Sequence, residues 1–366
     1  MNILFIANFS TNIASGLNWS VPAKVRAQEK IDNCMLLNLS NTYMEHWKDT
    51  KSFHKLNEFG EKVSLDILPA PFNHPDIVVF EGFYHMKDPK FARELRKAKI
   101  PYIIVPRGSL THQAMNNHSK WKKRLAHLFI FDRYCHKAAG IQYLTPAEFN
   151  DSGTKWNKHN FVIPNGFSTP SRKKEAFHQD SIKATFIGRL DMYHKGIDVL
   201  LDTCERLKDE LRAVGFTLCF YGPRRYQHDL IHQTIKEKGL HDFITMGGEI
   251  SGKAKENCLL DSDLFVLTSR FEGHPMGLIE ALAYGVPAIV TPGSNMAKEI
   301  READAGWTCN DVTVDEITKM LRKMIADRNL LEVKSKNAMK LAEPYDWDKL
   351  AIKFHDELVR LTNEKK

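Results

Sequence analysis

The sequence lacks several patterns that define large functional classes. Neither GxGxxG, the phosphate-binding pattern of dinucleotide-binding proteins, nor GxxxxGK[ST], the P-loop pattern, occurs in the 366 residues. No apolar run approaches the roughly 20 residues that a transmembrane helix requires. The first residues, MNILFIANFS, have no basic leader and no small-residue cleavage site, so they predict a strand and not a signal peptide. These absences argue against a nicotinamide dehydrogenase and a P-loop nucleotidase.

Cysteine is sparse, and the rest of the composition is that of a folded protein. The six cysteines are scattered and none forms a CxxC pair. They predict reduced, mostly buried thiols of a cytoplasmic protein, and neither a disulfide framework nor a zinc site. Hydrophobic residues make up 43% and charged residues 27%, which excludes a disordered chain. At about 150 residues per domain, the length predicts two domains.

Positive charge is concentrated in the first half of the chain. Residues 1–166 contain 22 Lys and Arg against 14 Asp and Glu, whereas the remainder contains 30 against 31. Within 90–137, 12 basic residues face only two acidic ones, Glu94 and Asp132. This region is either a solubilising surface or a footprint for anionic lipid head groups or a phosphorylated acceptor. The apolar spacing of 118–134 predicts an amphipathic helix, which can lie on a membrane or pack on a core.

Short apolar runs alternate with amphipathic stretches through both halves of the chain. Strands are expected at 3–7, 34–39, 77–80, 102–105, 140–144 and 161–164 and, after a polar stretch at 167–182, at 184–188, 217–222, 243–248, 264–269 and 287–291. Helices are expected near 197–212, 226–238, 253–260, 277–284 and 347–362. Such alternation predicts parallel sheets with covering helices, and the two series predict two Rossmann-like lobes.

Two carboxylates follow the strand expected at 264–269. Glu272 lies in a Gly/Pro loop, and Glu280 lies in the first turn of a helix expected to start near Gly277. An ionised carboxylate accepts two hydrogen bonds side by side, so this pair suits vicinal hydroxyls. Gly273 and Gly277 allow backbone N–H groups to approach a ligand, and the helix N-terminus favours a negative partner. Alternatively, Glu280 only interacts with the helix dipole and Glu272 is a loop charge.

Two cations follow the strand expected at 184–188. The strand ends in Gly188, Arg189 comes next, and Lys195 lies six residues further along. Fixed cations at the ligand edge of a sheet can hold a diphosphate and neutralise its charge as it leaves, without a divalent metal. The alternative is a pair of surface cations.

Two loops in the first half are further candidates. Gly16 follows the first strand and could bring backbone N–H groups against a phosphate, although a lone glycine is also common in ordinary turns. Arg107 and His112 follow the strand expected at 102–105, where the first lobe would meet a ligand. The alternative for His112 is a surface histidine.

Together these clusters resemble a known family. Four motifs occur in the order that this family shows. They are the glycine loop after the first strand, VIPNG at 162–166, GRL and KG within 188–196, and Glu272 and Glu280 in an E-x7-E pattern. This arrangement resembles the retaining glycosyltransferases of the GT-B fold, family 4. The resemblance implies an α/β protein with two Rossmann-like lobes whose parallel sheets face a central cleft. It implies an acceptor-binding domain at 1–166, a nucleotide-sugar-binding domain at 167–345 and a helix at 346–366 that packs back toward the first lobe.

The resemblance also implies roles for single residues. Arg189 and Lys195 bind the diphosphate of the donor, Glu280 the ribose hydroxyls and Glu272 the hydroxyls of the donor sugar. Relatives often carry His where this chain has Arg107, so Arg107 and His112 stay alternatives for the group that approaches the reacting sugar. The expected catalytic residues are Arg189, Lys195, Glu272, Arg107 and His112. The expected donor-binding residues are Gly16, Gly188, Arg189, Lys195, Gly248, Ile250, Glu272, Gly273, His274, Pro275, Met276, Gly277 and Glu280.

The activity implied is a retaining, metal-independent transfer of a hexose from a nucleoside-diphosphate sugar, UDP in preference to GDP. The acceptor is expected to be a sugar, lipid-linked, in cell-surface polysaccharide biosynthesis. We expect no cofactor, no nucleic-acid partner and a cytoplasmic location, with 90–137 touching an anionic inner membrane face. Asp261-Ser262-Asp263 resembles the DxD metal motif of another glycosyltransferase fold, but it precedes a strand and is expected to be structural.

Several alternatives remain open at this point. Within the same fold, the chain could be a sugar phosphorylase, a nucleotide-sugar hydrolase or an epimerase. From another class, it could be a non-catalytic nucleotide-sugar-binding partner of a second transferase. A nucleic-acid-binding protein is disfavoured, because the sequence contains no nucleic-acid motif.

Overall fold

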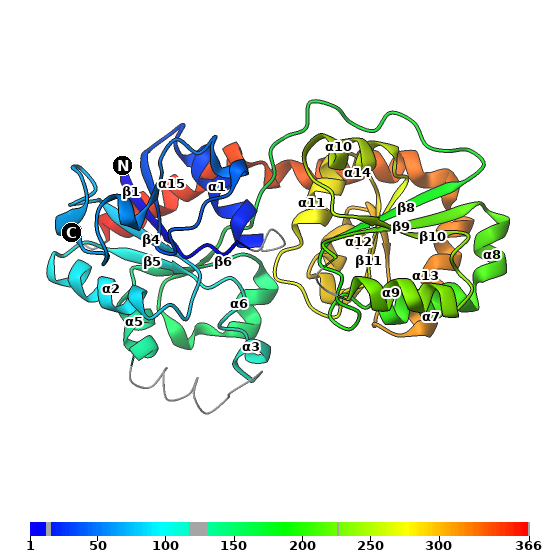
Figure 1. Ribbon diagram of the computed structural model, residues 1–366, viewed down its shortest axis with the longest axis horizontal. Helices are drawn as coiled ribbons and strands as arrows, with labels where there is room; N and C mark the ends of the chain where they lie inside the picture. The colour runs from blue at the N-terminus through cyan, green and yellow to red at the C-terminus, as the bar shows by residue number, and fades with distance from the viewer. Residues whose placement is uncertain (12–15, 117–129, 225–226, 365–366) are drawn as a thin grey trace. The chain divides into compact units, whose positions relative to one another are not determined.

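The computed structural model describes residues 1–11, 16–116, 130–224 and 227–364 (Figure 1). The chain divides into two compact units. Unit 1 comprises Met1–Ser168 and Trp347–Lys366, and unit 2 comprises Thr169–Asp346.

Unit 1 contains a seven-stranded sheet in the order β3-β2-β1-β4-β5-β6-β7, with every neighbouring pair parallel. Its strands are β1 (Asn2–Ala7), β2 (Asn33–Asn38), β3 (Phe53–Lys55), β4 (Ile77–Glu81), β5 (Tyr102–Val105), β6 (Gly140–Tyr143) and β7 (Asn160–Val162). Its described helices are α1 (Gly16–Gln28), α2 (Lys87–Lys97), α3 (His112–Asn116), α5 (Asp132–Lys137), α6 (Pro146–Ser152) and α15 (Trp347–Asn363). Short 3₁₀ turns lie at Glu45–Trp47, Leu56–Glu58, Leu65–Ile67 and Thr154–Trp156.

Both faces of this sheet are buried, as a parallel sheet requires. Alternate residues of β1 enter two separate cores, because successive side chains of a strand point to opposite faces. Phe5 packs in the core that α1 and α15 cover, and its ring lies 6.2 Å from that of Phe354 on α15. Leu4 packs in the core that includes Phe91 of α2 and Tyr134 of α5. The last helix of the chain therefore belongs to unit 1 and packs against α1.

Unit 2 contains a six-stranded parallel sheet in the order β10-β9-β8-β11-β12-β13. Its strands are β8 (Ile182–Ile187), β9 (Phe216–Tyr221), β10 (Ile244–Gly248), β11 (Leu264–Leu267), β12 (Ala288–Val290) and β13 (Gly306–Thr308). Its helices are α7 (Ile197–Arg206), α8 (Lys208–Ala213), α9 (His228–Glu237), α10 (Gly252–Asp261), α11 (Met276–Ala283), α12 (Ala297–Glu302), α13 (Val314–Ala326) and α14 (Leu331–Ala342), with 3₁₀ turns at Pro292–Ser294, Arg328–Leu330 and Glu343–Tyr345.

The alternation of strands and helices predicted from sequence is confirmed, with differences in detail. Strand β10 ends at Gly248, as the strand expected at 243–248 does. The helix expected at 197–212 is two helices, α7 and α8. Most of the amphipathic helix expected at 118–134 lies outside the described residues.

Each sheet has one point at which the strand order reverses. In unit 1 this switch point lies between β1 and β4, and in unit 2 between β8 and β11. In open parallel sheets, ligands bind beyond the carboxyl ends of the strands at such a point. The residues that follow these four strands are therefore candidates for a ligand-binding site.

Candidate functional site

The switch point of unit 2 holds an ion pair between two residues predicted to bind the donor. Lys195 follows β8 and Glu272 follows β11. Lys195 Nζ donates a hydrogen bond to Glu272 Oε1, and Ser269 Oγ donates to the same oxygen over 2.6 Å. The Lys195 and Glu272 side chains are only 13% and 10% exposed. The two residues, 77 positions apart in the chain, thus form one charged group at the ligand edge of the sheet.

The backbone after Lys195 fits this place only with glycine. Gly196 has a φ of +60°, and a β-carbon there would lie 2.0 Å from the carbonyl oxygen of Thr268. The Thr268 hydroxyl donates to the carbonyl oxygens of Lys195 and Gly196 over 3.2 and 3.1 Å. The loop after β8 is therefore fastened directly to the end of β11, which fixes the position of Lys195.

Arg189, the second predicted cation, lies on the same loop. It follows Gly188, and its Nη2 atom lies 3.8 Å from Asp191 Oδ2, with the side chain 38% exposed. Burial lowers the pKa of His194, and the charges of Arg189 and Lys195 lower it further. The loop thus carries two cations around a neutral imidazole.

Glu280 forms the second ion pair of the site. Its Oε2 atom accepts from Lys255 Nζ on α10, a residue that the sequence analysis did not single out. Helix α11 begins at Met276, so Glu280 is its fifth residue and not part of the first turn as predicted. Because the helix dipole acts mainly within the first turn, the partner of Glu280 is Lys255 and not the helix end.

The loop between the two glutamates is held by hydrogen bonds to its backbone. Asn295 Nδ2 donates to the carbonyl oxygens of Glu272 and Gly273. Gly273 is exposed, whereas His274 and Pro275 are buried, and Met276 and Gly277 begin α11. Burial lowers the pKa of His274 to about 3, and its ring lies 5.4 Å from that of Tyr345.

The remaining donor-binding candidates of unit 2 lie along the same edge. The Gly188 N–H donates to the carbonyl oxygen of Tyr221 over 3.0 Å, and the Gly222 N–H donates to that of Gly248 over 2.8 Å. These bonds join the ends of β8, β9 and β10. Ile250, two residues beyond β10, is half-buried.

Three predicted residues belong to unit 1. Gly16 is the exposed first residue of α1, and His112 is the exposed first residue of α3. Arg107 follows β5 and lies inside a buried network. Its Nε and Nη2 atoms donate to Glu81 Oε2 over 3.0 and 2.8 Å, and Nη1 donates to Ser20 Oγ and Asn165 Oδ1 over 2.9 and 3.3 Å.

Glu81 is the centre of this network. Its other oxygen accepts from Lys24 Nζ over 2.9 Å, and Lys24 also donates to Gln142 Oε1 over 2.9 Å. The Glu81 side chain is fully buried, and those of Lys24 and Arg107 are 7% and 12% exposed. Burial opposes ionisation of Glu81, but the two cations outweigh it and lower its pKa. Four groups from distant parts of the sequence thereby tie α1, β4, β5 and β6 together.

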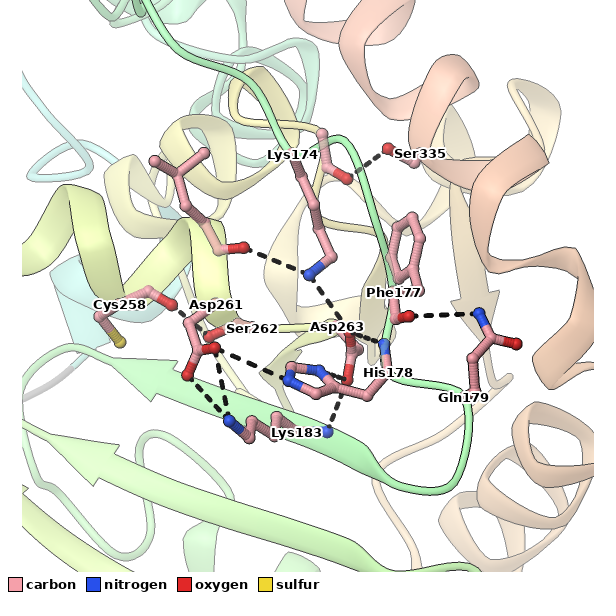
Figure 2. A network of polar contacts seen from close by, with 12 residues as sticks. Lys174, Phe177, His178, Gln179, Lys183, Cys258, Asp261, Ser262, Asp263 and Ser335 are labelled. Atoms are coloured by element: carbon pink, nitrogen blue, oxygen red, sulfur yellow. Dashed lines mark hydrogen bonds and ion pairs between the residues drawn. The ribbon is translucent and has the colours of Figure 1, made fainter.

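The Asp261-Ser262-Asp263 motif has a structural role, as expected. It precedes β11 and therefore lies at the edge of the sheet opposite to Lys195 and Glu272. Figure 2 shows Asp263 surrounded by Lys174, His178 and Lys183. Asp263 accepts from Lys174 Nζ at 3.2 Å, from the backbone N–H of Lys183 over 2.9 Å, and pairs with His178 Nδ1 at 2.8 Å. This cluster fastens the segment after unit 1 to the sheet of unit 2.

Substitutions of the two aspartates of the motif are expected to change the free energy of unfolding by different amounts. Asp263 is fully buried, so Asp263→Asn should lower the free energy of unfolding of unit 2 by about 1–3 kcal/mol, since it weakens hydrogen bonds to buried donors. The Asp261 side chain is 64% exposed, so Asp261→Ala should leave stability unchanged. Urea unfolding of both variants measures this, and equal effects of the two substitutions would contradict the structural role of Asp263.

Within the described residues, no group of three His, Cys, Asp or Glu side chains is arranged to hold a metal ion. None of the described helices combines the length and the apolar character needed to cross a bilayer.

Comparison with known proteins finds a family match that spans most of unit 2. Residues 167–341 match the family described as Glycosyl transferases group 1. A putative teichuronic acid biosynthesis glycosyltransferase of Bacillus subtilis is 36% identical over 120 residues, which cover 33% of this chain and 27% of that protein. The chain spans less than half the length of the curated relatives that it matches.

Solved structures are similar over almost the whole chain. The sucrose-phosphate synthase from Thermosynechococcus elongatus has a TM-score of 0.77 at 14% identity, covering 99% of both chains. Anabaena Alr3699/HepE, solved in complex with UDP, has a TM-score of 0.76 at 16% identity, covering 98% of this chain and 100% of that one. These similarities and the two parallel sheets confirm the predicted GT-B type of fold, with two Rossmann-like domains.

Proposed function

We propose that the protein is a retaining, metal-independent glycosyltransferase that moves a hexose from a nucleoside-diphosphate sugar, UDP in preference to GDP. The acceptor is a lipid-linked sugar, and the reaction belongs to cell-surface polysaccharide biosynthesis. It takes place at the cytoplasmic face of a membrane. The family match at 167–341 and the names of relatives in polysaccharide biosynthesis support this function. The UDP-bound state of Anabaena Alr3699/HepE supports UDP as the donor's nucleotide.

The observation that carries the proposal is the Lys195–Glu272 pair at the switch point of unit 2. An ammonium group has three N–H donors, and one of them goes to Glu272, so two remain for phosphate oxygens. Within the described part of the chain, Lys195 and Ser269 both donate to Oε1 of Glu272, and no residue donates to Oε2. One end of the pair can therefore hold a diphosphate while the other accepts from a sugar hydroxyl.

The second ion pair suits the nucleoside. Lys255 donates a hydrogen bond to Glu280 of α11. Gly248 and Ile250 lie at the same edge of the sheet, where β10 ends. A carboxylate with one oxygen held can accept from a ribose hydroxyl with the other. We assign Glu280 to the ribose and the turn at Gly248 to the base.

The chemical step breaks the bond between the anomeric carbon and the diphosphate. Positive charge develops on the sugar and negative charge on the leaving oxygen. Arg189 and Lys195 stabilise that leaving charge more in the transition state than in the ground state, which is what accelerates a step. For retention, the acceptor hydroxyl attacks from the face that the diphosphate leaves, and the leaving phosphate takes its proton.

The acceptor side is assigned to unit 1 and the membrane contact to its basic region. On α2, Lys90, Arg93 and Lys97 are exposed, and Lys99 follows them. Exposed cations of this kind attract an anionic lipid surface. This arrangement supports a lipid-linked acceptor, with residues 90–137 toward the membrane.

A panel of nucleotide sugars tests the proposal. UDP-glucose, UDP-galactose, UDP-N-acetylglucosamine and GDP-mannose are compared by thermal unfolding and by release of nucleoside diphosphate. A ligand at 100 times its Kd stabilises the folded state by about 2.7 kcal/mol, so at least one UDP sugar should raise the unfolding temperature and be turned over. Stabilisation by GDP-mannose alone would correct the base, and neither stabilisation nor turnover with any donor would contradict the function.

A further inference from the structure

The switch point of unit 1 holds a histidine to which the proposed reaction assigns no role. Strands β1 and β4 are neighbours, and they end at Ala7 and Glu81. Asn8 follows β1, and His85 follows β4 after a short turn. Asn8 Nδ2 lies 2.9 Å from His85 Nδ1. The pair therefore occupies the position in unit 1 that Lys195 and Glu272 occupy in unit 2, where parallel sheets bind ligands.

The hydrogen bond from Asn8 decides where the proton of His85 lies. An amide nitrogen only donates, so Nδ1 accepts and the proton of the neutral ring is on Nε2. Burial lowers the pKa of His85, which favours this neutral form. Among the described residues none accepts from Nε2, and that atom is not fully enclosed by protein. The Nε2–H group is therefore a donor open to a ligand.

The turn that carries His85 is held in an unusual conformation. Gly82 has a φ of +116°, and a β-carbon there would lie 3.3 Å from His85 Nε2. Tyr84 has a φ of +60°, a conformation that costs a bulky residue about 1–3 kcal/mol. Backbone strain of this kind is kept only where the surrounding structure enforces it, and it is concentrated at functional sites. The Tyr84 hydroxyl lies 3.0 Å from Met115 Sδ, which anchors the turn.

The charges next to the turn are already engaged. Lys24 donates to Glu81 and Gln142 and lies 3.9 Å from the centre of the Phe354 ring. Arg107 donates to Glu81 through two nitrogens. Both cations nearest to the start of the turn are thus held by Glu81, whose single carboxylate leaves the three groups with a net charge of +1. The Nε2–H group itself is uncharged and can donate one hydrogen bond to a hydroxyl oxygen.

We propose that His85 Nε2–H donates to a hydroxyl oxygen of the sugar acceptor, with Asn8 as the positioning residue that fixes the imidazole. This inference rests on the proposed function and adds to it a residue of the acceptor site. It concerns acceptor binding alone, so the donor site of unit 2 should not depend on it.

Acceptor kinetics test this role. UDP-glucose serves as the donor, and the p-nitrophenyl β-glycosides of glucose, galactose, mannose and N-acetylglucosamine serve as acceptor probes. At least one glycoside should raise UDP release above the rate of hydrolysis by the wild-type protein. His85→Ala should raise the KM for that glycoside about tenfold, the equivalent of about 1.4 kcal/mol. UDP binding and UDP-glucose hydrolysis should stay within about twofold of wild type.

Three further variants separate this role from a structural one. His85→Gln offers an amide N–H in place of Nε2–H and should recover part of the acceptor affinity. Asn8→Ala should raise the KM for the glycoside less than His85→Ala does. His74→Ala removes an exposed histidine that precedes β4 and so lies at the opposite edge of the sheet, and should change neither reaction.

The outcomes distinguish this inference from the proposed function. An unchanged KM in His85→Ala, or a parallel loss of UDP-glucose hydrolysis, would overturn the assignment of His85. So would a wild-type protein that hydrolyses UDP-glucose but is not accelerated by any glycoside. A wild-type protein that is neither stabilised by any nucleotide sugar of the panel nor turns any of them over would instead overturn the proposed function, and the role of His85 with it.

Discussion

Lys195→Ala is expected to lower the turnover of a nucleotide sugar by roughly 10²–10³-fold, the usual effect of removing one donor that stabilises transition-state charge. The substitution removes the ammonium group that Glu272 now holds at the switch point of unit 2. It leaves the Glu272 carboxylate, which is 10% exposed, without its cation, so an anionic diphosphate is also repelled. Both kcat and kcat/KM should fall, as measured by release of UDP from UDP-glucose.

A matched lysine controls for the loss of charge. The Lys298 side chain, on α12 of the same unit, is 82% exposed and lies 3.8 Å from Glu302. Lys298→Ala should leave turnover unchanged. Far-UV circular dichroism and urea unfolding establish that each variant is folded. Turnover of Lys195→Ala within about twofold of wild type would remove the proposed role of Lys195.

Glu81→Ala is expected to lower the stability of unit 1 by about 3–5 kcal/mol. Removing one member of a buried ion network leaves its partners as uncompensated buried charges. Here the partners are Lys24 and Arg107, whose side chains are 7% and 12% exposed. The measurement is the urea midpoint of the unfolding transition of unit 1. Because a chain of two units need not unfold in one step, fluorescence and circular dichroism should be followed together.

An exposed pair in the same unit provides the comparison. The side chains of Glu45 and Lys48 are 80% and 60% exposed, so Glu45→Ala should have a much smaller effect. If the two substitutions shifted the midpoint equally, the network around Glu81 would not stabilise the unit as argued.

The same network predicts how stability depends on pH. The pKa of Glu81 is lower in the folded state than its usual value, so its ionised form is favoured by folding. Its contribution is therefore present above the unfolded-state pKa and is lost as the pH falls through the folded-state pKa. The wild-type protein should lose more stability on acidification than Glu81→Gln.

The place of the candidate donor-binding residues in unit 2, at one edge of the sheet, could be predicted because each follows a strand that the sequence marks clearly. The apolar runs before Arg189 and before Glu272 are β8 and β11, and parallel strands bring their carboxyl ends to one edge. The contact between Lys195 and Glu272 follows from the order of the strands, which the sequence did not show. Lys255 was missed because it lies inside a helix, where nothing in the local pattern points to Glu280.

The network of unit 1 could not have been predicted from local patterns. Lys24 and Glu81 are 57 positions apart, and Lys24 and Gln142 are 118 positions apart. Each is an ordinary polar residue in its own segment, and only the sheet order brings them together. Strands β3 and β13, which were not predicted, read FHK and GWT, and each contains only one apolar side chain, so neither shows an apolar run.

Hydrogen exchange with and without UDP tests the central claim most directly, because it locates the bound nucleotide without any substitution. If the edge at the switch point of unit 2 binds the diphosphate and the nucleoside, UDP should slow amide exchange in peptides covering 188–196, 248–255 and 271–280. Peptides covering Lys174 and Asp263, at the opposite edge, should exchange at unchanged rates. Protection confined to other segments, or none at saturating UDP and GDP, would contradict the account.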